Sequence, residues 1–262
     1  MNLHLQNKPV LVLASSGGIG LGVATEFARE GAKVMLFARS EDKLAAAAEA
    51  IAAETGNRPL YTVGDLTDPA SVAEAVERTA REFGGLWALF NNTGGPPAGG
   101  FDSFDDAAWQ SAFELTVLGY VRAIRAALPH LRAGGGGRIV NNASVSTKQA
   151  IDGLLLSNVF RSGLVGLGKS LARELGRDGV LVNTVGAGRI DTDRIAALDT
   201  IWAEKAGLTR EEQRAKSEAA IPLGRYGTPA DFARAVVWLG SGANGYVTGQ
   251  NLLIDGGGTE AY

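Results

Sequence analysis

Val10-Leu-Val-Leu-Ala-Ser-Ser-Gly-Gly-Ile-Gly20 is the stretch of this chain that decides its fold. The apolar run Val10–Leu13 ends in a turn of small residues, and apolar residues then recur at helical spacing along Leu21–Arg29. We therefore expect a buried strand, a tight turn and a helix, which together present backbone N–H groups and a helix N-terminus to a phosphate. Gly18 and Gly20 allow the backbone to approach a pyrophosphate and the helix to pack against its strand.

The order of the remaining segments matters, because a glycine motif alone also fits an ordinary strand–helix turn. Continuous apolar strands alternate with amphipathic helices along the chain, which predicts one α/β domain over residues 1–262 with a doubly wound, seven-stranded parallel sheet. After the first strand, six more are expected at 33–38, 60–64, 86–91, 138–144, 180–185 and 251–255. Long helices are expected at Phe104–Leu131 and Leu155–Leu175, and a substrate lid of short helices at 191–220.

The composition limits the classes of function. A net charge of −3 leaves no basic surface for nucleic acid or for an anionic membrane. The chain has no cysteine, and its two histidines, His4 and His130, are too far apart in sequence to suggest a metal site. No apolar run approaches the roughly 18 residues of a membrane span, and the first strand starts too early to leave room for a signal peptide. We therefore expect a cytoplasmic protein without a metal site, nucleic-acid partner or membrane partner.

Small and polar residues gather where the expected strands end. Ligands of doubly wound sheets bind beyond these carboxyl ends, so the same residues are the candidates for a binding site. They are Ala14–Gly20, Arg39, Asp65, Asn92–Gly94, Ser144 and Gly186–Thr192.

The residue after the second expected strand indicates the type of dinucleotide. In such folds an Asp or Glu about 20 residues past the glycines binds the ribose 2′-OH and favours NAD. Here Ala38 and Arg39 occupy that place, so a guanidinium is available for a 2′-phosphate and no carboxylate repels it. The expected cofactor is therefore NADP, with NAD less favoured.

These motifs make the chain resemble the short-chain dehydrogenase/reductase family, and in particular its bacterial 3-oxoacyl-acyl-carrier-protein-reductase-like branch. The family's Thr-Gly-x-x-x-Gly-Ile-Gly reads Leu13-Ala-Ser-Ser-Gly-Gly-Ile-Gly20, with Ala14 at the first glycine. Four later family motifs correspond to Asp65-Leu66, Asn91-Asn-Thr-Gly94, Ala187-Gly-Arg-Ile-Asp-Thr192 and Tyr246–Gly257. The resemblance implies a Rossmann fold that binds the cofactor through Ala14, Ser15, Ser16, Gly18, Ile19, Gly20, Arg39, Asp65, Leu66, Asn92, Thr93, Gly94, Arg161, Ile190 and Thr192.

The catalytic positions implied by the resemblance carry different residues. Ser144 stands where the family has its serine after the fifth strand. Ser157 stands at the tyrosine of Tyr-x-x-x-Lys, and Arg161 stands at its lysine. Thr116 occupies the place of the asparagine on the preceding long helix. The candidate catalytic residues are thus Ser144, Ser157, Arg161 and Thr116, and three of the four are replacements.

The replacements change the proton chemistry that these positions can support. A tyrosine phenol has a pKa of about 10, which a nearby ammonium lowers further, whereas a serine hydroxyl is far less acidic. Arg161 keeps a positive charge that can hold the nicotinamide ribose hydroxyls, but a guanidinium does not release protons. Thr116 forms hydrogen bonds without the carbonyl and amide geometry of asparagine. The scaffold for hydride transfer is kept, and the usual proton donor is missing.

Other side chains are open to two interpretations. Lys148 could supply a proton or be a solvated surface lysine, and Tyr120 could face the site or pack at a subunit interface. Asp191, Asp193 and Arg194 could close over substrate or cap the helix that follows. The four tryptophans fit core or interface burial better than a stacking platform; they are Trp87, Trp109, Trp202 and Trp238.

Two functions from different classes remain. The first is an NADP(H)-dependent oxidoreductase that acts on a small carbonyl or alcohol substrate with altered proton-transfer residues. The second is a dinucleotide-binding protein without redox turnover, acting as a sensor or partner subunit. The resemblance further implies a homotetramer, in which Phe104–Leu131 and Leu155–Leu175 pair across one axis and the strand near Leu252–Ile254 pairs across another.

Overall fold

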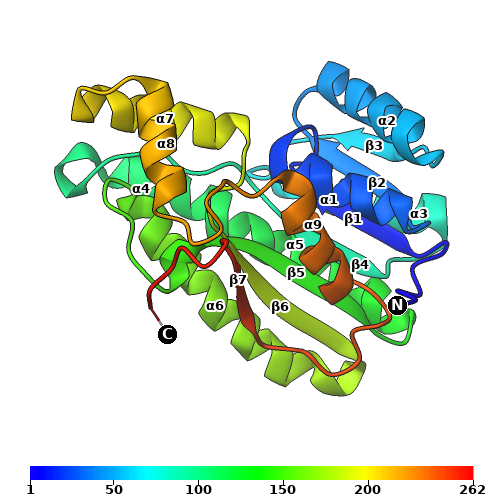
Figure 1. Ribbon diagram of the computed structural model, residues 1–262. Helices are drawn as coiled ribbons and strands as arrows, with labels where there is room; N and C mark the ends of the chain where they lie inside the picture. Colours follow the sequence, from blue (N-terminus) through cyan, green and yellow to red (C-terminus); the bar gives the residue numbers. More distant parts are fainter. Residues whose placement is uncertain (262) are drawn as a thin grey trace.

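The computed structural model describes residues 1–261, so Tyr262 of the expected domain lies outside the described residues. A seven-stranded parallel sheet with the order β3-β2-β1-β4-β5-β6-β7 lies between two layers of helices (Figure 1). The strands are β1 (Pro9–Leu13), β2 (Lys33–Ala38), β3 (Leu60–Val63), β4 (Ala88–Asn91), β5 (Gly137–Ser144), β6 (Val180–Ala187) and β7 (Asn251–Ile254). The helices of the two layers are α1 (Gly18–Arg29), α2 (Glu41–Thr55), α3 (Pro69–Phe83), α5 (Gly119–Ala133), α6 (Leu155–Leu175) and α9 (Pro229–Leu239).

Helices cover both faces of the sheet, and alternate residues of each strand point to opposite faces. Each strand between the two edge strands therefore contributes side chains to two cores. Val10 and Val12 of β1 join a core cluster that includes residues of α1, α2 and α9. Leu11 and Leu13 join a second cluster that includes residues of α3, α5 and α6. The continuous apolar strand in the sequence is explained by these two cores, and the predicted doubly wound fold is confirmed.

The site is positioned by a reversal of strand order. The chain moves from β1 outward to β2 and β3, then returns to place β4 on the other side of β1. The connections that leave β1 and β4 therefore diverge at their carboxyl ends, which opens a crevice where such sheets bind ligands.

The prediction of one helix over Phe104–Leu131 was wrong in its detail. The segment contains α4 (Asp106–Phe113), a π-helical turn over Glu114–Leu118 and α5. Apolar spacing did not reveal this turn, because a π turn adds a residue to the helix without breaking its backbone hydrogen bonding. By contrast, the expected bounds Leu155–Leu175 are those of α6.

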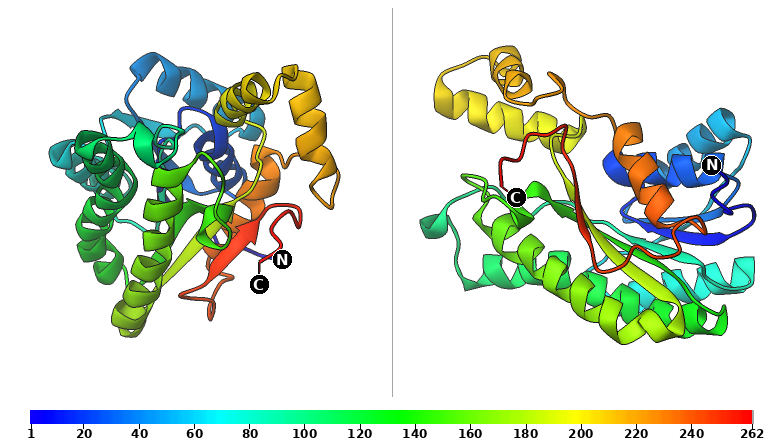
Figure 2. Two further views of the ribbon diagram at one scale, coloured as in Figure 1. Left: turned by 90° about the vertical axis from the view of Figure 1, so that its left-hand side faces the viewer. Right: turned by 60° about the horizontal axis from the view of Figure 1, so that its bottom comes forward.

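Two helices stand apart from the sheet and its layers. They are α7 (Asp193–Ala206) and α8 (Arg210–Ala219), which follow the carboxyl end of β6 and lie to one side of the sheet in both views of Figure 2. The expectation of short helices within 191–220 is therefore confirmed, while their role as a lid stays a prediction. Among residues 1–261, none of the helices combines the length and apolar character needed to cross a bilayer.

Candidate active site

A cavity of about 1510 Å³ opens at the carboxyl ends of the strands. It brings together most of the residues that the sequence singled out, although they are spread over more than 170 positions (192 − 14 = 178). Fifteen expected residues line it: Ala14, Ser16, Gly18, Ile19, Arg39, Asp65, Leu66, Asn92, Thr93, Gly94, Ser144, Ser157, Arg161, Ile190 and Thr192. Ser15, Gly20 and Thr116 are not among the lining residues.

The turn after β1 has a backbone that leaves its donors open to the cavity. Helix α1 begins at Gly18, and its N-cap Gly17 offers no side-chain hydrogen bond to the first-turn N–H groups. Gly18 has a φ of +55°, and Ala14 has a φ of +47°, which is uncommon for a residue with a side chain. The uncapped helix N-terminus is the donor set that an anion such as a pyrophosphate requires.

Gly20 and Ser15 shape this turn from behind. A Cβ added at Gly20 would overlap the carbonyl oxygen of Ala14 and lie 2.8 Å from Nδ2 of Asn92. The Ser15 hydroxyl donates to the carbonyl of Val12 at 2.8 Å and accepts from the Phe37 N–H at 3.0 Å. Both residues lie at the turn, as the sequence predicted, but they pack behind it and do not line the cavity.

The loop after β4 also lines the cavity next to this turn. The Thr93 side chain is buried there, and its Oγ1 has no hydrogen-bond partner among residues 1–261. A Cβ at Gly94 would meet no atom within 4 Å, so the backbone there is open. Together with the uncapped N-terminus of α1, these features fit a phosphate-bearing, ribose-bearing ligand.

A second polar group lies at the start of α2. Arg39 is exposed and lines the cavity together with Lys43. The pKa of Asp65 is lowered, first by the N–H of Thr67 that it accepts at 2.8 Å, and to a smaller extent by the charge of Arg39. Two cations thus flank the amino end of a helix, and this is the donor chemistry that suits a phosphate monoester.

A chain of asparagine contacts connects the two halves of the site. Asn92 donates Nδ2–H to the carbonyl of Ala14 at 3.2 Å, and its own Oδ1 accepts from Asn142 Nδ2 at 2.8 Å. The main-chain carbonyl of Asn142 accepts from Arg161 Nη1 at 2.7 Å and from the Tyr120 hydroxyl at 3.0 Å. Asn142 therefore fixes the position of the Arg161 guanidinium relative to the glycine-rich turn. The sequence analysis did not identify this residue.

Ser144, Ser157 and Arg161 line one part of the cavity wall. The Ser144 hydroxyl accepts from the Ser146 N–H at 3.1 Å, so it also caps the short turn that follows β5. Ser157 and Arg161 lie one turn apart on α6, and both are buried. The three side chains Ser144, Ser157 and Arg161 are thus brought together in one cavity.

Three other candidates are placed outside the cavity wall. Thr116 is fully buried, and its hydroxyl donates to the carbonyl of Ala112 within the helix. Tyr120 is 0% exposed in a single chain, so it faces neither the cavity nor a subunit interface. Burial raises the pKa of Tyr120 to about 12, although the charge and hydrogen bond of Arg161 oppose that shift. Lys148 is not among the residues that line the cavity.

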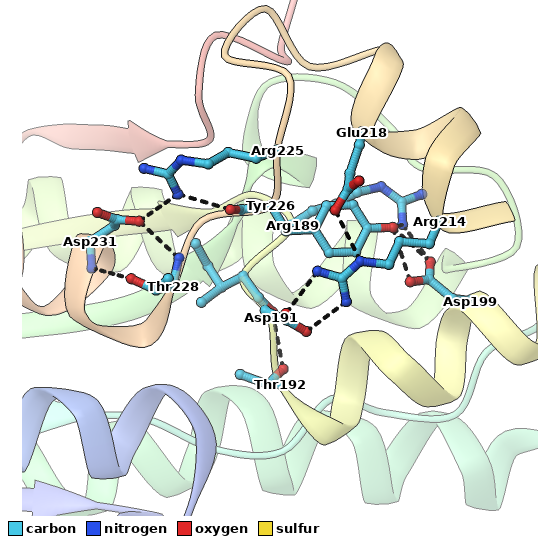
Figure 3. A network of polar contacts seen from close by, with 11 residues as sticks. Arg189, Asp191, Thr192, Asp199, Arg214, Glu218, Arg225, Tyr226, Thr228 and Asp231 are labelled. Atoms are coloured by element: carbon cyan, nitrogen blue, oxygen red, sulfur yellow. Dashed lines mark hydrogen bonds and ion pairs between the residues drawn. The ribbon is translucent and has the colours of Figure 1, made fainter. Parts of the chain in front are cut away.

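The α7–α8 segment is attached to the rest of the protein by a network of charged and aromatic side chains (Figure 3). Arg189, just after β6, donates Nη1–H to Asp199 Oδ1 at 2.8 Å and to the Tyr226 hydroxyl at 3.1 Å. The Tyr226 hydroxyl donates to Asp199 Oδ2 at 2.9 Å. Arg214 of α8 forms a two-pronged ion pair with Asp191 and stacks over Tyr226, with its guanidinium carbon 4.7 Å from the ring centroid.

This network corrects part of the sequence interpretation. Asp191 neither caps α7 nor contacts the cavity, because it pairs with Arg214, whose hydrogen bond lowers the pKa of Asp191. Trp202, expected in a core or interface, lines the cavity with the Arg189 guanidinium carbon 4.7 Å from its ring centroid. The cation–aromatic contact depends on residues 13 apart (202 − 189), so no local periodicity could indicate it.

Known proteins resemble this chain over almost its whole length. The family model described as enoyl-(acyl carrier protein) reductase matches residues 13–259. The 3-oxoacyl-acyl-carrier-protein reductase of Escherichia coli is 32% identical over 255 residues, covering 97% of this chain and 98% of that protein. The corresponding reductase of Chlamydia muridarum is 30% identical, covering 98% of this chain and 99% of that protein.

Solved structures show the same architecture. An L-sorbose reductase from Gluconobacter frateurii, complexed with NADPH and L-sorbose, has a TM-score of 0.94 at 31% identity, with 100% of both chains covered. An actinorhodin polyketide ketoreductase with NADPH has a TM-score of 0.92 at 29% identity, covering 99% of this chain and 100% of that one. The fold, the strand-end cavity and these matches agree, and the chain belongs to the short-chain dehydrogenase/reductase family.

Proposed function

We propose that this protein is an NADP(H)-dependent oxidoreductase that acts on a small carbonyl or alcohol substrate. The observation that carries the proposal is one cavity lined at one part by Arg39 and Lys43 and at another by Ser144, Ser157 and Arg161. A phosphate-binding region and a polar reaction region in one cavity are what a dinucleotide reductase needs. The NADPH complexes of the sorbose reductase and the polyketide ketoreductase support the choice of cofactor.

The cofactor is assigned to the part of the cavity whose donors fit it. The N-terminus of α1 would receive the pyrophosphate, and Arg39 with Lys43 would pair with the 2′-phosphate. NADPH, when bound, supplies a hydride to the substrate. Arg161 would hold the nicotinamide ribose hydroxyls, and Asn142 orients its guanidinium through the 2.7 Å hydrogen bond.

The proposed reaction uses the chain's own residues for positioning rather than for acid catalysis. The Ser144 hydroxyl polarises the substrate carbonyl from the end of β5. Ser157 adds a hydroxyl to the wall but does not act as the general acid, because an unassisted hydroxyl is too weakly acidic near neutral pH. Tyr120 is excluded from this role by its burial and by a pKa of about 12. Water or the substrate itself would therefore provide the proton.

The segment 191–220 is proposed as the substrate lid. Trp202 of α7 and Lys216 of α8 line the cavity, and the Arg189–Asp199 ion pair connects the lid to the strand-end loop. The lid would thus contribute both wall and support to the cavity that Ser144 also lines.

We also propose that the protein assembles as a homotetramer. Two apolar side chains that a monomer leaves exposed lie along α4 and α6: Phe113 is 36% exposed and Val159 is 44% exposed. Strand β7 is an edge of the sheet, and its Leu252 is 42% exposed. Unpaired edges and exposed apolar faces favour association of subunits. Light scattering at micromolar concentration tests this, and a stable monomer would contradict it.

The function is tested by following NADPH absorbance with ketones, β-ketoesters and quinones while fluorescence reports cofactor binding. Ser157→Ala should stay within a few-fold of the wild-type rate, whereas losing an essential acid costs about 10²–10⁴-fold. Ser144→Ala should lower kcat, and Arg161→Ala should raise the cofactor KM and lower the rate. A folded Ser157→Ala protein that binds NADPH but is inactive would overturn the proposed role of Ser157. Cofactor binding without turnover of any compound would favour the sensor or partner-subunit function.

A further inference from the structure

Besides Arg39 at the nucleotide end, two guanidiniums line the cavity without forming an ion pair to a carboxylate among residues 1–261. Arg161 reaches it from α6, and Arg194 reaches it from the first turn of α7. Neither forms an ion pair with an Asp or Glu anywhere in residues 1–261, although Asp152 and Asp193 also line the cavity. A guanidinium that is withdrawn from water without a countercharge is costly, and a second one nearby increases that cost.

The position of Arg194 is fixed by the loop after β4. Its Nη2–H donates to the carbonyl of Pro96 at 2.8 Å. This hydrogen bond joins α7 to the loop after β4. A Cβ at Gly95 would lie 2.8 Å from Nη2 and 2.9 Å from Nε of Arg194, so the glycine provides the space for this side chain. The pKa of Arg194 is lowered, first by burial and then by the charge of Arg161. Arg161 therefore adds a second positive charge to the wall of the same cavity.

Both guanidiniums have donors to spare. Each has five N–H groups, and the main-chain carbonyls of Asn142 and Pro96 take one from Arg161 and one from Arg194. An anionic group in the cavity would accept hydrogen bonds from some of the remaining N–H groups. Its negative charge would also balance the positive charges of Arg161 and Arg194.

We infer that Arg194, supported by the positive charge of Arg161 in the same cavity, forms an anion-binding subsite for the substrate, so that the preferred substrate is a carbonyl or alcohol compound bearing a carboxylate or a similar anionic group. This inference rests on the proposed function for the assignment of the anion to a substrate. The cofactor phosphates are assigned to other donors, at the N-terminus of α1 and at Arg39. The substrate is thus the ligand left to supply the countercharge.

The inference is tested by binding, with benzoate as the anionic probe and benzamide as its neutral counterpart of similar shape. The protein is loaded with NADP⁺ so that no reduction occurs, and ligand-observed NMR gives both dissociation constants. Wild type should bind benzoate at least about tenfold more tightly than benzamide, because charge-assisted hydrogen bonds discriminate by that order. Arg194→Gln should bring the two affinities within about twofold, and Arg194→Lys should keep part of the preference.

Control variants distinguish a substrate subsite at Arg194 from a cofactor contact and from a general effect of the protein's net charge. Arg58→Gln removes a guanidinium that pairs with Glu49 outside the cavity, and it should keep the benzoate preference. Circular dichroism establishes that each variant is folded, and an NADP⁺ titration reports the cofactor site separately. Equal affinities for the two probes in wild type, or no measurable benzoate binding, would overturn the inference. An Arg194→Gln protein with tenfold weaker NADP⁺ binding would also overturn it, because Arg194 would then hold the cofactor.

Failure of the proposed function is visible in a separate measurement. If the wild-type protein does not bind NADP⁺, the cofactor assignment fails, while the benzoate and benzamide titrations of the unloaded protein still test the arginine pair. If NADP⁺ binds and benzoate shows no preference, the cofactor assignment stands and the anionic substrate class is wrong.

Discussion

The glycine-rich end of the cavity and its α7–α8 end are held by different kinds of interaction. At the glycine-rich end, the turn Ala14–Gly20 is shaped by backbone conformation, with a positive φ at Ala14 and Gly18. At the other end, α7 and α8 are held by the side chains of Arg189, Asp199 and Tyr226, which come from three separate segments (Figure 3). The first end tolerates few changes of residue size, whereas the second depends on charge and hydrogen bonding.

This difference explains why the sequence predicted the glycine-rich turn but not the side-chain network around α7 and α8. A turn whose geometry is set by neighbouring residues has a recognisable local pattern. A network assembled over 37 positions (226 − 189) has none, and its partners become neighbours only when the chain folds. The following predictions test whether the backbone end and the side-chain end respond as differently as the structure implies.

The largest effect is expected for Gly20→Ala. The added Cβ would overlap the Ala14 carbonyl oxygen, so the turn must shift, at a cost of about 3 kcal/mol in the free energy of unfolding. The displaced N–H groups should also weaken NADPH binding by at least about tenfold. Urea unfolding and fluorescence titration measure the two effects. Gly17→Ala is the control, since its Cβ would meet no atom within 4 Å and its backbone is extended, so its stability should stay close to wild type.

Asp199→Ala should give the next largest effect, confined to α7 and α8. The Asp199 carboxylate is buried and accepts from Arg189 and Tyr226, so its loss leaves a partly buried guanidinium unpaired. We expect a cost of about 2 kcal/mol, below the range for a fully buried pair because the Arg189 side chain is 28% exposed. Hydrogen exchange should quicken in α7 and α8 while the sheet amides are unchanged. Asp193→Ala, on the same helix but without an ion pair to any residue of 1–261, should show little change. Equal effects of the two variants would contradict the network's role.

Arg39→Ala tests the charge requirement at the nucleotide end. Wild type should prefer NADPH over NADH, and the variant should lose at least about tenfold in NADPH affinity, corresponding to about 1.5 kcal/mol. NADH affinity should be unchanged, since NADH has no 2′-phosphate. Arg58→Ala removes an exposed guanidinium that pairs with Glu49 outside the cavity and serves as the control. Equal affinities of wild type for the two cofactors would refute the assignment.

The smallest effect is expected for the Asp191–Arg214 pair as pH changes. Arg214 lowers the pKa of Asp191 in the folded protein below the value of about 3.9 in an unfolded chain. The pair therefore stabilises the fold above about pH 4, and the contribution is lost as the pH falls through the folded pKa. Because the Asp191 side chain is 47% exposed, Asp191→Asn should cost only about 0.5 kcal/mol near pH 6.

Urea unfolding of wild type and Asp191→Asn at several pH values measures this contribution. The difference between the two proteins should shrink below about pH 4, where the wild-type carboxylate also becomes neutral. Asp178→Asn breaks a surface pair with Arg132 at the far side from the lid and calibrates the effect of an ordinary exposed ion pair. A difference that stays constant down to acid pH would show that charge is not the cause.

Most of the predicted site residues line one cavity because strand ends meet at one edge of a parallel sheet. Residues as distant as Ser16 and Thr192 line the same cavity because each follows a strand that ends there. The expectation that Thr116 lines the site failed because of the orientation of its side chain on the helix. Thr116 lies in a π-helical turn that apolar spacing did not reveal, and its hydroxyl bonds within the helix instead of facing the cavity.

The sequence by itself determined the doubly wound sheet, the turn at Ala14–Gly20 and the position of Arg39, because these depend on residues close together in the chain. The tertiary structure alone decided that Tyr120 is buried and shares the Asn142 carbonyl with Arg161. It also decided that Arg194 passes Gly95 to reach the Pro96 carbonyl. These contacts join helices and loops that approach one another only when both faces of the sheet are packed. Local pattern therefore specified the elements, and long-range packing specified which side chains face the ligand.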